Sequence, residues 1–402
     1  MDPLLFMVHR IPYPPNKGDK IRSFNILRWL SQRYEVHLGC FVDDENDQQY
    51  VSKLSEYCCS YKVVKLKPTL AKVLSLRAFV TGDPITLPYY ASSELMGWVN
   101  ETVEKHQIKQ SLAFSSSMAQ YVMDIRFSQM NRVIDLVDVD SDKWRQYAEK
   151  SSFPMSWVYR REHQKLEVYE RKIASNLDAI ALVSPEEVIL FKTLLPDALR
   201  GKVVAVSNGV DSDFFDNKVP VESIELPELI LSFTGAMDYW ANVEAVTWFC
   251  DKVWPSVLSC FPSAYFYIVG TSPSSEVLAL HSFNNVVVTG RVKDVRPYIN
   301  ASTVVVAPLR IARGIQNKVL EALAMEKVVI GTSMAFEGIA HQHKTLGVVI
   351  ADDKDNFIES VVNQIKLALD DYGNNIKPEN RTFVTEYYNW DAKLQRLTGL
   401  LR

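Results

Sequence analysis

The sequence predicts an α/β fold made of two doubly wound domains, each built on a parallel sheet. Short apolar, β-branched segments alternate with helical patterns along the chain, which is the pattern of βαβ units. The series occurs twice, on either side of a polar and turn-rich segment at 207–228. A chain of 402 residues is also long enough for two domains of ordinary size. We therefore expect an N-terminal domain over 1–207 and a C-terminal domain over 208–387.

The expected strands of the first half are short buried runs at 4–8, 35–42, 62–66, 111–115, 132–136, 178–183 and 202–206. Between the first two lies a helical pattern at 21–33, with Ile21, Phe24, Leu27 and Leu30 on one face. The expected strands of the second half are 229–233, 264–270, 286–290, 303–308, 327–332 and 346–351. Helical patterns separate them, so right-handed crossovers and parallel pairing follow.

The composition is that of a soluble globular enzyme, with 47% hydrophobic and 23% charged residues. A net charge of −4 argues against nucleic acid as a partner. Five cysteines without a CxxC pair indicate reduced thiols and no zinc site, as in a cytoplasmic protein. Asp2 precedes the first apolar run and Arg10 follows it, which is the reverse of a secretory signal.

Parallel sheets of this kind bind ligands at the carboxyl ends of their strands, so loops that follow strands are candidate sites. The loop at 9–22, "HRIPYPPNKGDKIR", contains Gly18, where a ligand could approach the backbone, and Lys20, which adds charge. The alternative is a plain turn in which Asp19 caps the next helix. A GxGxxG fingerprint is absent, which disfavours a nicotinamide cofactor.

The most informative loop follows the strand at 303–308 and leads into a helix expected at about 315–325. One face of that helix is apolar and must pack on the sheet: Val319, Leu320, Leu323 and Ala324. The opposite face is polar: Gly314, Asn317, Lys318 and Glu321. Helix N–H groups with an amide and an ammonium suit phosphates, and a carboxylate one turn later suits a ribose diol. The alternative is a surface Lys–Glu pair worth only ~0.2–0.5 kcal/mol.

Two further glycines end strands of the same sheet. Gly235 follows the strand at 229–233, and Gly290 with Arg291 follows the strand at 286–290. Three glycine loops at one edge favour a shared site, although each glycine alone is commonly just a turn residue.

The chain resembles a known family along nearly its whole length. The segments "TGR", "APLR" and "GIQNKVLEALA", with "SNGVDSDFF" at 207–215, are similar to the donor half of the retaining GT-B glycosyltransferases called family 4. A narrower group is also similar, the sugar transferases of exosortase/PEP-CTERM exopolysaccharide systems. That similarity rests on "HRIPYPPNKGDKIRSFNILRWL", "DLVDVDSDKWRQYA" and "FTGAMDYWANVEAV".

The resemblance implies a GT-B fold and transfer of a sugar, with retention, from a UDP- or GDP-linked donor. The acceptor implied is a glycan or a polyprenyl-diphosphate-linked glycan. Glu321 would hold the ribose, the backbone at Arg291 and Val292 would meet the base, and a last helix at about 388–402 would pack back on the N-terminal domain. The donor-binding set is Gly18, Lys20, Gly235, Arg291, Val292, Arg310, Arg313, Gly314, Ile315, Gln316, Asn317, Lys318 and Glu321.

The chain departs from the family pattern at several positions. Arg313 stands where the family has a second glutamate, eight residues before Glu321. The usual glycine–arginine and lysine after the first strand of the C-terminal domain are replaced around Ala236, Met237 and Asn242. Our hypothesis is that the missing positive charge comes from three other residues: Arg310, Arg313 and Lys318.

On the acceptor side, Asp138 follows the strand at 132–136 and is the candidate for orienting the acceptor hydroxyl, and His9 ends the first strand and could touch the sugar. The alternatives are helix capping and structural roles. "DVD" at 138–140 matches a metal-binding DxD pattern, but short matches are frequent by chance and the GT-B resemblance implies metal-independent transfer. We therefore name Asp138, Lys318, Glu321 and His9 as the catalytic group and expect no metal or other cofactor.

The segment 57–82 contains five Lys or Arg and no acidic residue, and its part at 67–80 reads as a basic amphipathic helix. This pattern is typical of peripheral binding to an anionic membrane, here the inner face of the cytoplasmic membrane, although an ordinary surface helix also fits it. Two other functions share the predicted fold: a non-transferring enzyme such as a nucleotide-sugar 2-epimerase, and a weakly catalytic nucleotide-binding scaffold.

Overall fold

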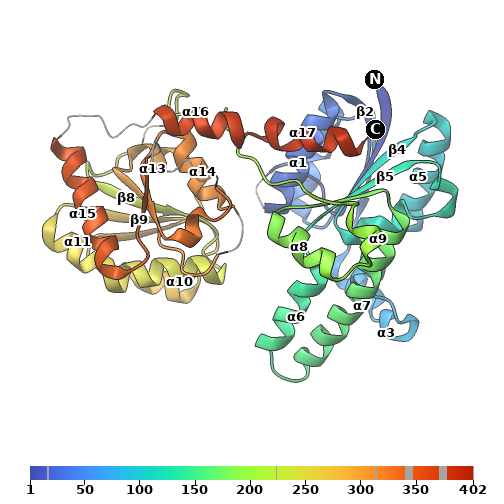
Figure 1. The fold of residues 1–402 in the computed structure, drawn as a ribbon, viewed down its shortest axis with the longest axis horizontal. Coiled ribbons are helices and arrows are strands. Elements are labelled where there is room, and N and C mark those ends of the chain that lie inside the picture. Colours follow the sequence, from blue (N-terminus) through green and yellow to red (C-terminus); the bar gives the residue numbers. More distant parts are fainter. Residues whose placement is uncertain (16–17, 223, 313–314, 340–346, 371–377, 402) are drawn as a thin grey trace. The chain divides into compact units, whose positions relative to one another are not determined.

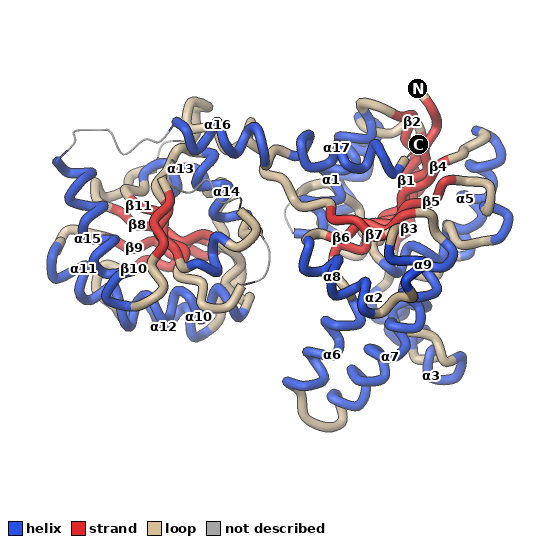
Figure 2. Tube along the Cα trace, viewed as in Figure 1, coloured by secondary structure: helices blue, strands red, loops and turns tan. Residues whose placement is uncertain are grey.

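The computed structural model describes all residues except 16–17, 223, 313–314, 340–346, 371–377 and 402. The chain divides into two compact units. Unit 1 comprises Met1–Ser207 with Leu394–Arg402, and unit 2 comprises Asn208–Lys393. Each unit contains one parallel sheet with helices around it (Figures 1 and 2).

The sheet of unit 1 has seven strands in the order β3-β2-β1-β4-β5-β6-β7, and every neighbouring pair is parallel. The strands are β1 (Asp2–Val8), β2 (Tyr34–Val42), β3 (Ser60–Lys65), β4 (Gln110–Phe114), β5 (Asn131–Val137), β6 (Ala179–Leu182) and β7 (Val203–Ala205). β1 is an interior strand and is fully buried from Leu4 to Val8, because an interior parallel strand is covered on both faces.

The helices of unit 1 begin with α1 (Gly18–Ser31) and include two that project together, α6 (Asp140–Lys150) and α7 (Met155–Asn176) (Figure 1). The others are η1 (Glu45–Glu56), α2 (Pro68–Ser75), α3 (Ala78–Thr81), α4 (Thr86–Tyr89), α5 (Ser93–His106), η2 (Ser116–Tyr121), η3 (Ile125–Phe127), α8 (Pro185–Thr193) and α9 (Asp197–Arg200). Serine caps start two of them, since Ser92 accepts from Leu95 N and Ser184 accepts from Glu187 N.

Unit 2 contains a six-stranded parallel sheet in the order β10-β9-β8-β11-β12-β13. The strands are β8 (Ile230–Thr234), β9 (Tyr265–Val269), β10 (Val286–Gly290), β11 (Val304–Ala307), β12 (Val329–Gly331) and β13 (Val348–Ile350). From β8 the chain builds outward to β10, and from β11 it builds in the opposite direction to β13. The switch point therefore lies between β8 and β11, which is where an open α/β sheet has a crevice for a ligand.

Helices surround this second sheet as well (Figure 2). They are α10 (Trp240–Trp248), η4 (Phe249–Val253), α11 (Trp254–Cys260), α12 (Ser275–Ala279), η5 (Leu280–Ser282), α13 (Arg296–Ala301), α14 (Asn317–Ala324), η6 (Ser333–Phe336), α15 (Lys354–Asp370) and α16 (Pro378–Tyr387). The last helix, α17 (Trp390–Leu400), begins in unit 2, and its residues from Leu394 onward belong to unit 1. There Asn131 Nδ2 donates to the carbonyl of Leu400 at 2.7 Å.

Each strand expected from the sequence is present within a few residues of its predicted range, and both sheets are parallel, so the predicted fold class is confirmed. None of the described helices is both long enough and apolar enough to cross a membrane.

Candidate functional site

The first turn of α14 stands at the switch point, directly after the loop that leaves β11. Gln316 is its N-cap residue, with extended backbone and no side-chain capping bond, so the first N–H groups are not capped from that side chain. Within the described residues, Asn317 Oδ1 is buried and has no hydrogen-bond partner. A buried acceptor without a partner is costly, and it marks a place where a ligand donor would be favourable.

Lys318, in the same turn, contacts the first turn of α10, the helix that follows β8. Its Nζ donates a hydrogen bond to Asn242 Oδ1 of α10 and lies 4.5 Å from the centre of the Phe233 ring in β8. Burial lowers the pKa of Lys318 to about 8, and the nearby carboxylate of Glu321 only partly opposes this shift. The Lys318 ammonium is thus held between the end of β8, at Phe233, and the start of α10, at Asn242. A negative charge placed there would be attracted strongly.

Asn242 is itself anchored. Its Nδ2 donates to the carbonyl of Ala236 at 2.9 Å, which ties the side chain to the loop after β8. Asn242 thus supplies an acceptor for Lys318 at the start of α10.

Two glycines allow these loops to approach one another. A Cβ on Gly235 would come within 2.7 Å of Asn242 Nδ2 and 3.5 Å of Lys318 Nζ. A Cβ on Gly270, just after β9, would lie 1.6 Å from the carbonyl oxygen of Gly235. Any side chain at position 270 would therefore displace the loop that holds Asn242. Gly270 is not among the predicted site residues, although its place at the end of the strand expected at 264–270 was a usable signal.

Glu321 lies one turn beyond Lys318 on the polar face of α14. Burial raises the pKa of Glu321 to about 7, and the charge of Lys318 works against this rise. Among the described residues the two side chains form no ion pair, because Lys318 is bonded to Asn242. The two side chains therefore do not form the solvated surface pair of the alternative interpretation, and both are desolvated on one face of α14.

The apolar face of α14 packs as the sequence predicts. Val319, Leu320, Leu323 and Ala324 are completely buried in the core of unit 2. This packing sets the rotation of the helix, and the polar residues consequently turn towards the loop after β8.

The structure shows no contact between the remaining predicted donor residues that it describes and the side chains of Lys318 or Glu321. Arg310 lies 3.6 Å from Glu244 Oε1 and over the ring of Trp248, so its contacts are with α10 rather than with Lys318. Ile315 is half-buried against the core, and Arg291 is exposed just after β10. Gly290, before it, has a φ of 67°, a left-handed value that suits glycine. Arg313 and Gly314 lie outside the described residues.

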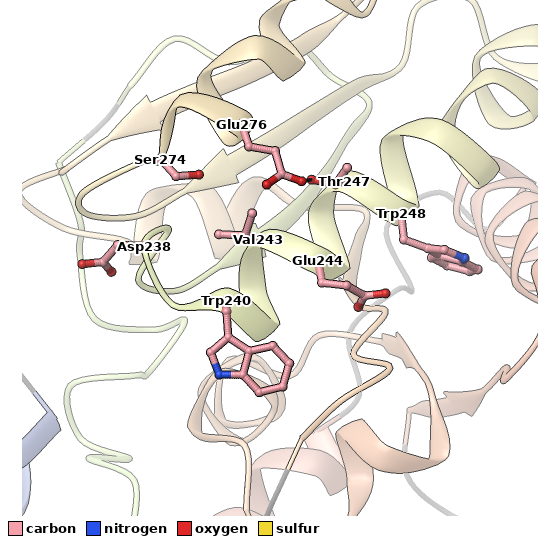
Figure 3. Close-up of a pocket in the computed structure, with 8 residues that line it drawn as sticks. All are labelled: Asp238, Trp240, Val243, Glu244, Thr247, Trp248, Ser274 and Glu276. Atoms are coloured by element: carbon pink, nitrogen blue, oxygen red, sulfur yellow. Dashed lines mark hydrogen bonds between the residues drawn. The ribbon is translucent and has the colours of Figure 1, made fainter. Parts of the chain in front are cut away.

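A cavity of about 470 Å³ lies beside this site, between α10 and the start of α12 (Figure 3). Its lining is acidic and aromatic: Asp238, Trp240, Val243, Glu244, Thr247, Trp248, Ser274 and Glu276. Figure 3 shows Glu276 and Thr247 turned towards each other, 3.4 Å apart. Most of the lining residues belong to α10 and α12, while Asp238 precedes α10 and Ser274 is the N-cap residue of α12. None of the predicted donor residues lines the cavity.

In unit 1, His9 follows β1 and contacts Asp19 and, through it, Arg10 in a chain of polar side chains at the carboxyl edge of the sheet. His9 Nε2 lies 3.3 Å from Asp19 Oδ2, and the same oxygen accepts from Arg10 at 2.9 Å. Burial tends to raise the pKa of Asp19, but the hydrogen bond with His9 and the charge of Arg10 outweigh it and hold that pKa well below its usual range. Asp19 is thus a carboxylate that orients the His9 ring and fixes its side chain beside Phe114.

Asp138 stands next to a strained backbone. Val137, the last residue of β5, has a φ of 70°, which is rare for a β-branched side chain. Ser115, just after β4, has a φ of 77° at the neighbouring strand end. Such conformations occur mostly where the surrounding structure holds a functional group in place. Asp138 itself is exposed, whereas Asp140 accepts from Ser116 Oγ at 2.5 Å.

Lys20 is placed differently from a ligand contact. It is 1% exposed, and its Nζ lies 2.6 Å from Asp47 Oδ2. Arg22 is buried in the same way against Asp135, at 2.7 Å. These two buried ion pairs connect α1 to its surroundings and account for both cations without a ligand. At Gly18 an added Cβ would meet open space.

Comparison with known proteins agrees with this architecture. Residues 228–367 match the family model described as "Glycosyl transferases group 1". Sucrose-phosphate synthase from Thermosynechococcus elongatus is similar in structure, with 16% identity, a TM-score of 0.66, and coverage of 100% of this chain and 98% of that one. Anabaena HepE, solved in complex with UDP, has 12% identity, a TM-score of 0.63 and coverage of 100% and 99%.

TarM is similar as well, with 10% identity, a TM-score of 0.64 and coverage of 100% and 99%. No curated protein matches the sequence of this chain. At such identities the structural likeness establishes the fold, which is GT-B, and the family match lies within unit 2. Together they support the coarse description of this chain as a GT-B glycosyltransferase.

Proposed function

We propose that this chain transfers a sugar, with retention of the anomeric configuration, from a nucleoside-diphosphate donor to a glycan or a polyprenyl-diphosphate-linked glycan. The observation that carries the proposal is the pair Lys318 and Glu321, one helical turn apart at the switch point of unit 2. The reaction type comes from the resemblance of the chain to the retaining family 4 transferases and to the sugar transferases of exopolysaccharide systems.

The two groups have complementary tasks towards such a donor. The ammonium of Lys318 and the first N–H groups of α14 face the diphosphate, which gains negative charge as the sugar leaves. The carboxylate of Glu321 accepts hydrogen bonds from the ribose hydroxyls. Because Lys318 is already oriented by Asn242 and Phe233, little reorganisation accompanies the build-up of charge.

The base of the donor is proposed to be uracil, with guanine as the second choice. HepE was solved with UDP and also with UDP-glucose, and its fold covers this chain from end to end. The backbone after Gly290, at Arg291 and Val292, is the proposed contact for the base, as the family resemblance implies. Among the remaining predicted contacts, Gly235 would admit the diphosphate to the loop after β8.

The acceptor is assigned to unit 1, with Asp138 orienting its hydroxyl and His9 contacting the transferred sugar. His9 is held for such a role by Asp19, and Asp138 follows the strained Val137. Lys318 and the helix N-terminus provide charge at the leaving diphosphate, so the reaction is proposed to need no metal ion. The basic, apolar segment at 67–80 would bring the enzyme to anionic lipid at the inner face of the cytoplasmic membrane.

The test begins with isothermal titration of UDP, GDP, ADP and TDP, followed by their sugars. We expect one diphosphate to bind clearly more tightly than the others, and its sugar to be consumed only when a glycan or lipid-linked acceptor is present. Retention is checked by the anomeric coupling of the product in an NMR spectrum. EDTA should leave the rate unchanged.

The same assay separates the alternatives. A 2-epimerase would convert the donor in the absence of any acceptor, and a scaffold would bind nucleotide without turnover. No binding of any nucleoside diphosphate at millimolar concentration would contradict the proposal.

A further inference from the structure

The segment α2–α3 packs on unit 1 with its apolar side reversed. The residues that it buries are small: Ala71, Ser75 and Ala78. The residues that it turns to solvent are large and apolar, with exposed fractions of 63% for Val73, 50% for Leu74, 59% for Leu76 and 91% for Val80. A surface helix of a globular domain normally does the opposite, because each exposed apolar side chain forgoes the free energy of burial.

A second apolar segment lies at the turn between α6 and α7. Phe153 is 82% exposed, Trp157 is 55% exposed and Met155 is 45% exposed. Figure 1 shows that these two helices form a hairpin that stands out from the rest of unit 1, with α3 beside α7. No signal in the sequence connected this turn with the segment at 67–80.

Side-chain contacts join the two segments into one surface. The rings of Phe79 and Trp157 stack at 6.0 Å with an interplanar angle of 12°, and the guanidinium of Arg161 lies 4.6 Å from the Phe79 ring centre. Arg161 also donates to the carbonyl of Asp83 at 3.1 Å. We call this surface the docking edge and define it by its exposed apolar residues: Val73, Leu74, Leu76, Val80, Phe153, Met155 and Trp157.

Cations accompany the docking edge. Lys67, Lys72 and Arg77 are exposed along α2–α3, and Arg160 is exposed on α7. No acidic residue occurs over 57–82, although exposed Asp83 follows directly, and exposed Glu149 of α6 is paired with Arg145 at 2.7 Å. Among the described residues, neither Lys72 nor Arg77 has a carboxylate partner within ion-pair distance.

We propose that the docking edge inserts its apolar side chains into an anionic lipid bilayer, while its lysines and arginines meet the lipid phosphates. The proposal deepens the proposed function and rests on it, since a lipid-linked acceptor would be reached at that surface. Aromatic and aliphatic side chains flanked by cations are what an interfacial membrane segment requires. A second copy of this chain fits less well, because a two-fold contact would bring the same cations face to face.

The test is flotation of the full-length protein, without nucleotide or acceptor, on two kinds of vesicle. One is made of equal parts phosphatidylglycerol and phosphatidylcholine, and the other is pure phosphatidylcholine. We expect binding to the anionic vesicles and little to the neutral ones. The variant Val80→Ser with Phe153→Ser should bind the anionic vesicles at least about tenfold more weakly, because two apolar side chains no longer enter the bilayer.

The matched control carries the same change at apolar positions elsewhere on unit 1, Ile125→Ser with Ile189→Ser, whose exposed fractions are 81% and 67%. This control should float like the parent protein. The variant Lys72→Glu with Arg77→Glu should abolish the preference for anionic lipid.

Three results would overturn the proposal. The first is a parent protein that does not float on anionic vesicles, and the second is a control variant that loses binding as much as the edge variant. The third is an edge variant that floats like the parent protein but sediments as a monomer where the parent sediments as a dimer. None of these measurements uses a donor sugar, so their failure leaves the nucleotide titrations above unaffected. Conversely, a protein that floats but binds no nucleotide would contradict the proposed function alone.

Discussion

Lys318 of α14 is bonded to Asn242 of α10, and this contact joins the two loops that flank the switch point of unit 2. The residues are 76 positions apart in the chain, and each lies in the first turn of a helix, α10 after β8 and α14 after β11. The ammonium is consequently oriented before any ligand arrives.

The first concerns the cation itself. Replacing Lys318 with Met should weaken UDP binding roughly 10- to 100-fold, because a hydrogen-bonded charge at the diphosphate is lost. Isothermal titration measures the change. The control is Lys252→Met on the same unit, a lysine with a half-exposed side chain, which should leave the affinity as it was. An unchanged affinity in Lys318→Met would remove the diphosphate from α14.

The second concerns the residue that orients the cation. Asn242→Ala removes the acceptor of Lys318 and should lower the free energy of unfolding by about 1–3 kcal/mol, since a buried donor loses its partner. UDP affinity should fall as well. Urea denaturation and titration report the two effects, and exposed Asn284→Ala serves as the control. A fully stable variant with normal affinity would show that Lys318 needs no such support.

The third concerns pH. Glu321, with its pKa raised to about 7, must be ionised to accept two ribose hydroxyl bonds, and Lys318, with its pKa lowered to about 8, must be protonated to attract phosphate. UDP affinity should therefore be highest between about pH 7 and pH 8 and fall on both sides. Lys318→Met should flatten the alkaline side of the profile, and Glu321→Gln the acid side. A profile with no decline above pH 8 in the parent protein would contradict the position assigned to Lys318.

The fourth concerns the cost of keeping Glu321. Because the folded state raises its pKa from 4.5 to about 7, this group favours folding below about pH 4.5, and that contribution is lost as pH rises through 7. Glu321→Gln should thus raise the free energy of unfolding at pH 8 by roughly 1–3 kcal/mol and have a smaller effect at pH 5. Urea denaturation at both pH values tests this, while titration should show weaker binding of the nucleotide. An equal gain at both pH values would point to packing rather than charge.

The fifth concerns the close approach of two loops. Gly270→Ala places a methyl group where the carbonyl of Gly235 lies, so we expect a loss of more than ~3 kcal/mol in the free energy of unfolding. Gly97→Ala is the control, because a Cβ there meets open space on α5. Denaturation of both variants gives the comparison. A Gly270→Ala protein as stable as the control would show that these loops can separate without penalty.

Much of the fold follows from local patterns in the sequence. Short, nearly continuous apolar runs predicted each strand, because a parallel strand that is buried on both faces is apolar on both. The apolar stripe of α14 likewise predicted which face meets the core, and thereby placed Lys318 and Glu321 together on the other. The two parallel sheets and the polar face of α14 could thus be predicted from periodicity, and the resemblance to a family implied the GT-B fold.

Contacts between residues that are distant in the sequence could not be predicted in this way. The sequence suggested that Arg310 would share the charge of Lys318, yet the structure directs it to Glu244 and Trp248. Lys20 resembled a ligand contact, yet it is buried against Asp47. Which carboxylate a cation meets depends on how helices pack across a sheet, and no local pattern encodes that choice.

By itself the sequence determined the two parallel sheets, the apolar face of α14 and the polar residues that this face leaves outward, since these depend on periodicity within one element. The tertiary structure alone decided that Lys318 would bond to Asn242, that Gly270 would admit the loop after β8, and that α2–α3 would turn its large apolar residues to solvent. Each of those outcomes is set by burial against a remote segment, and burial is a property of the packed chain rather than of any short stretch.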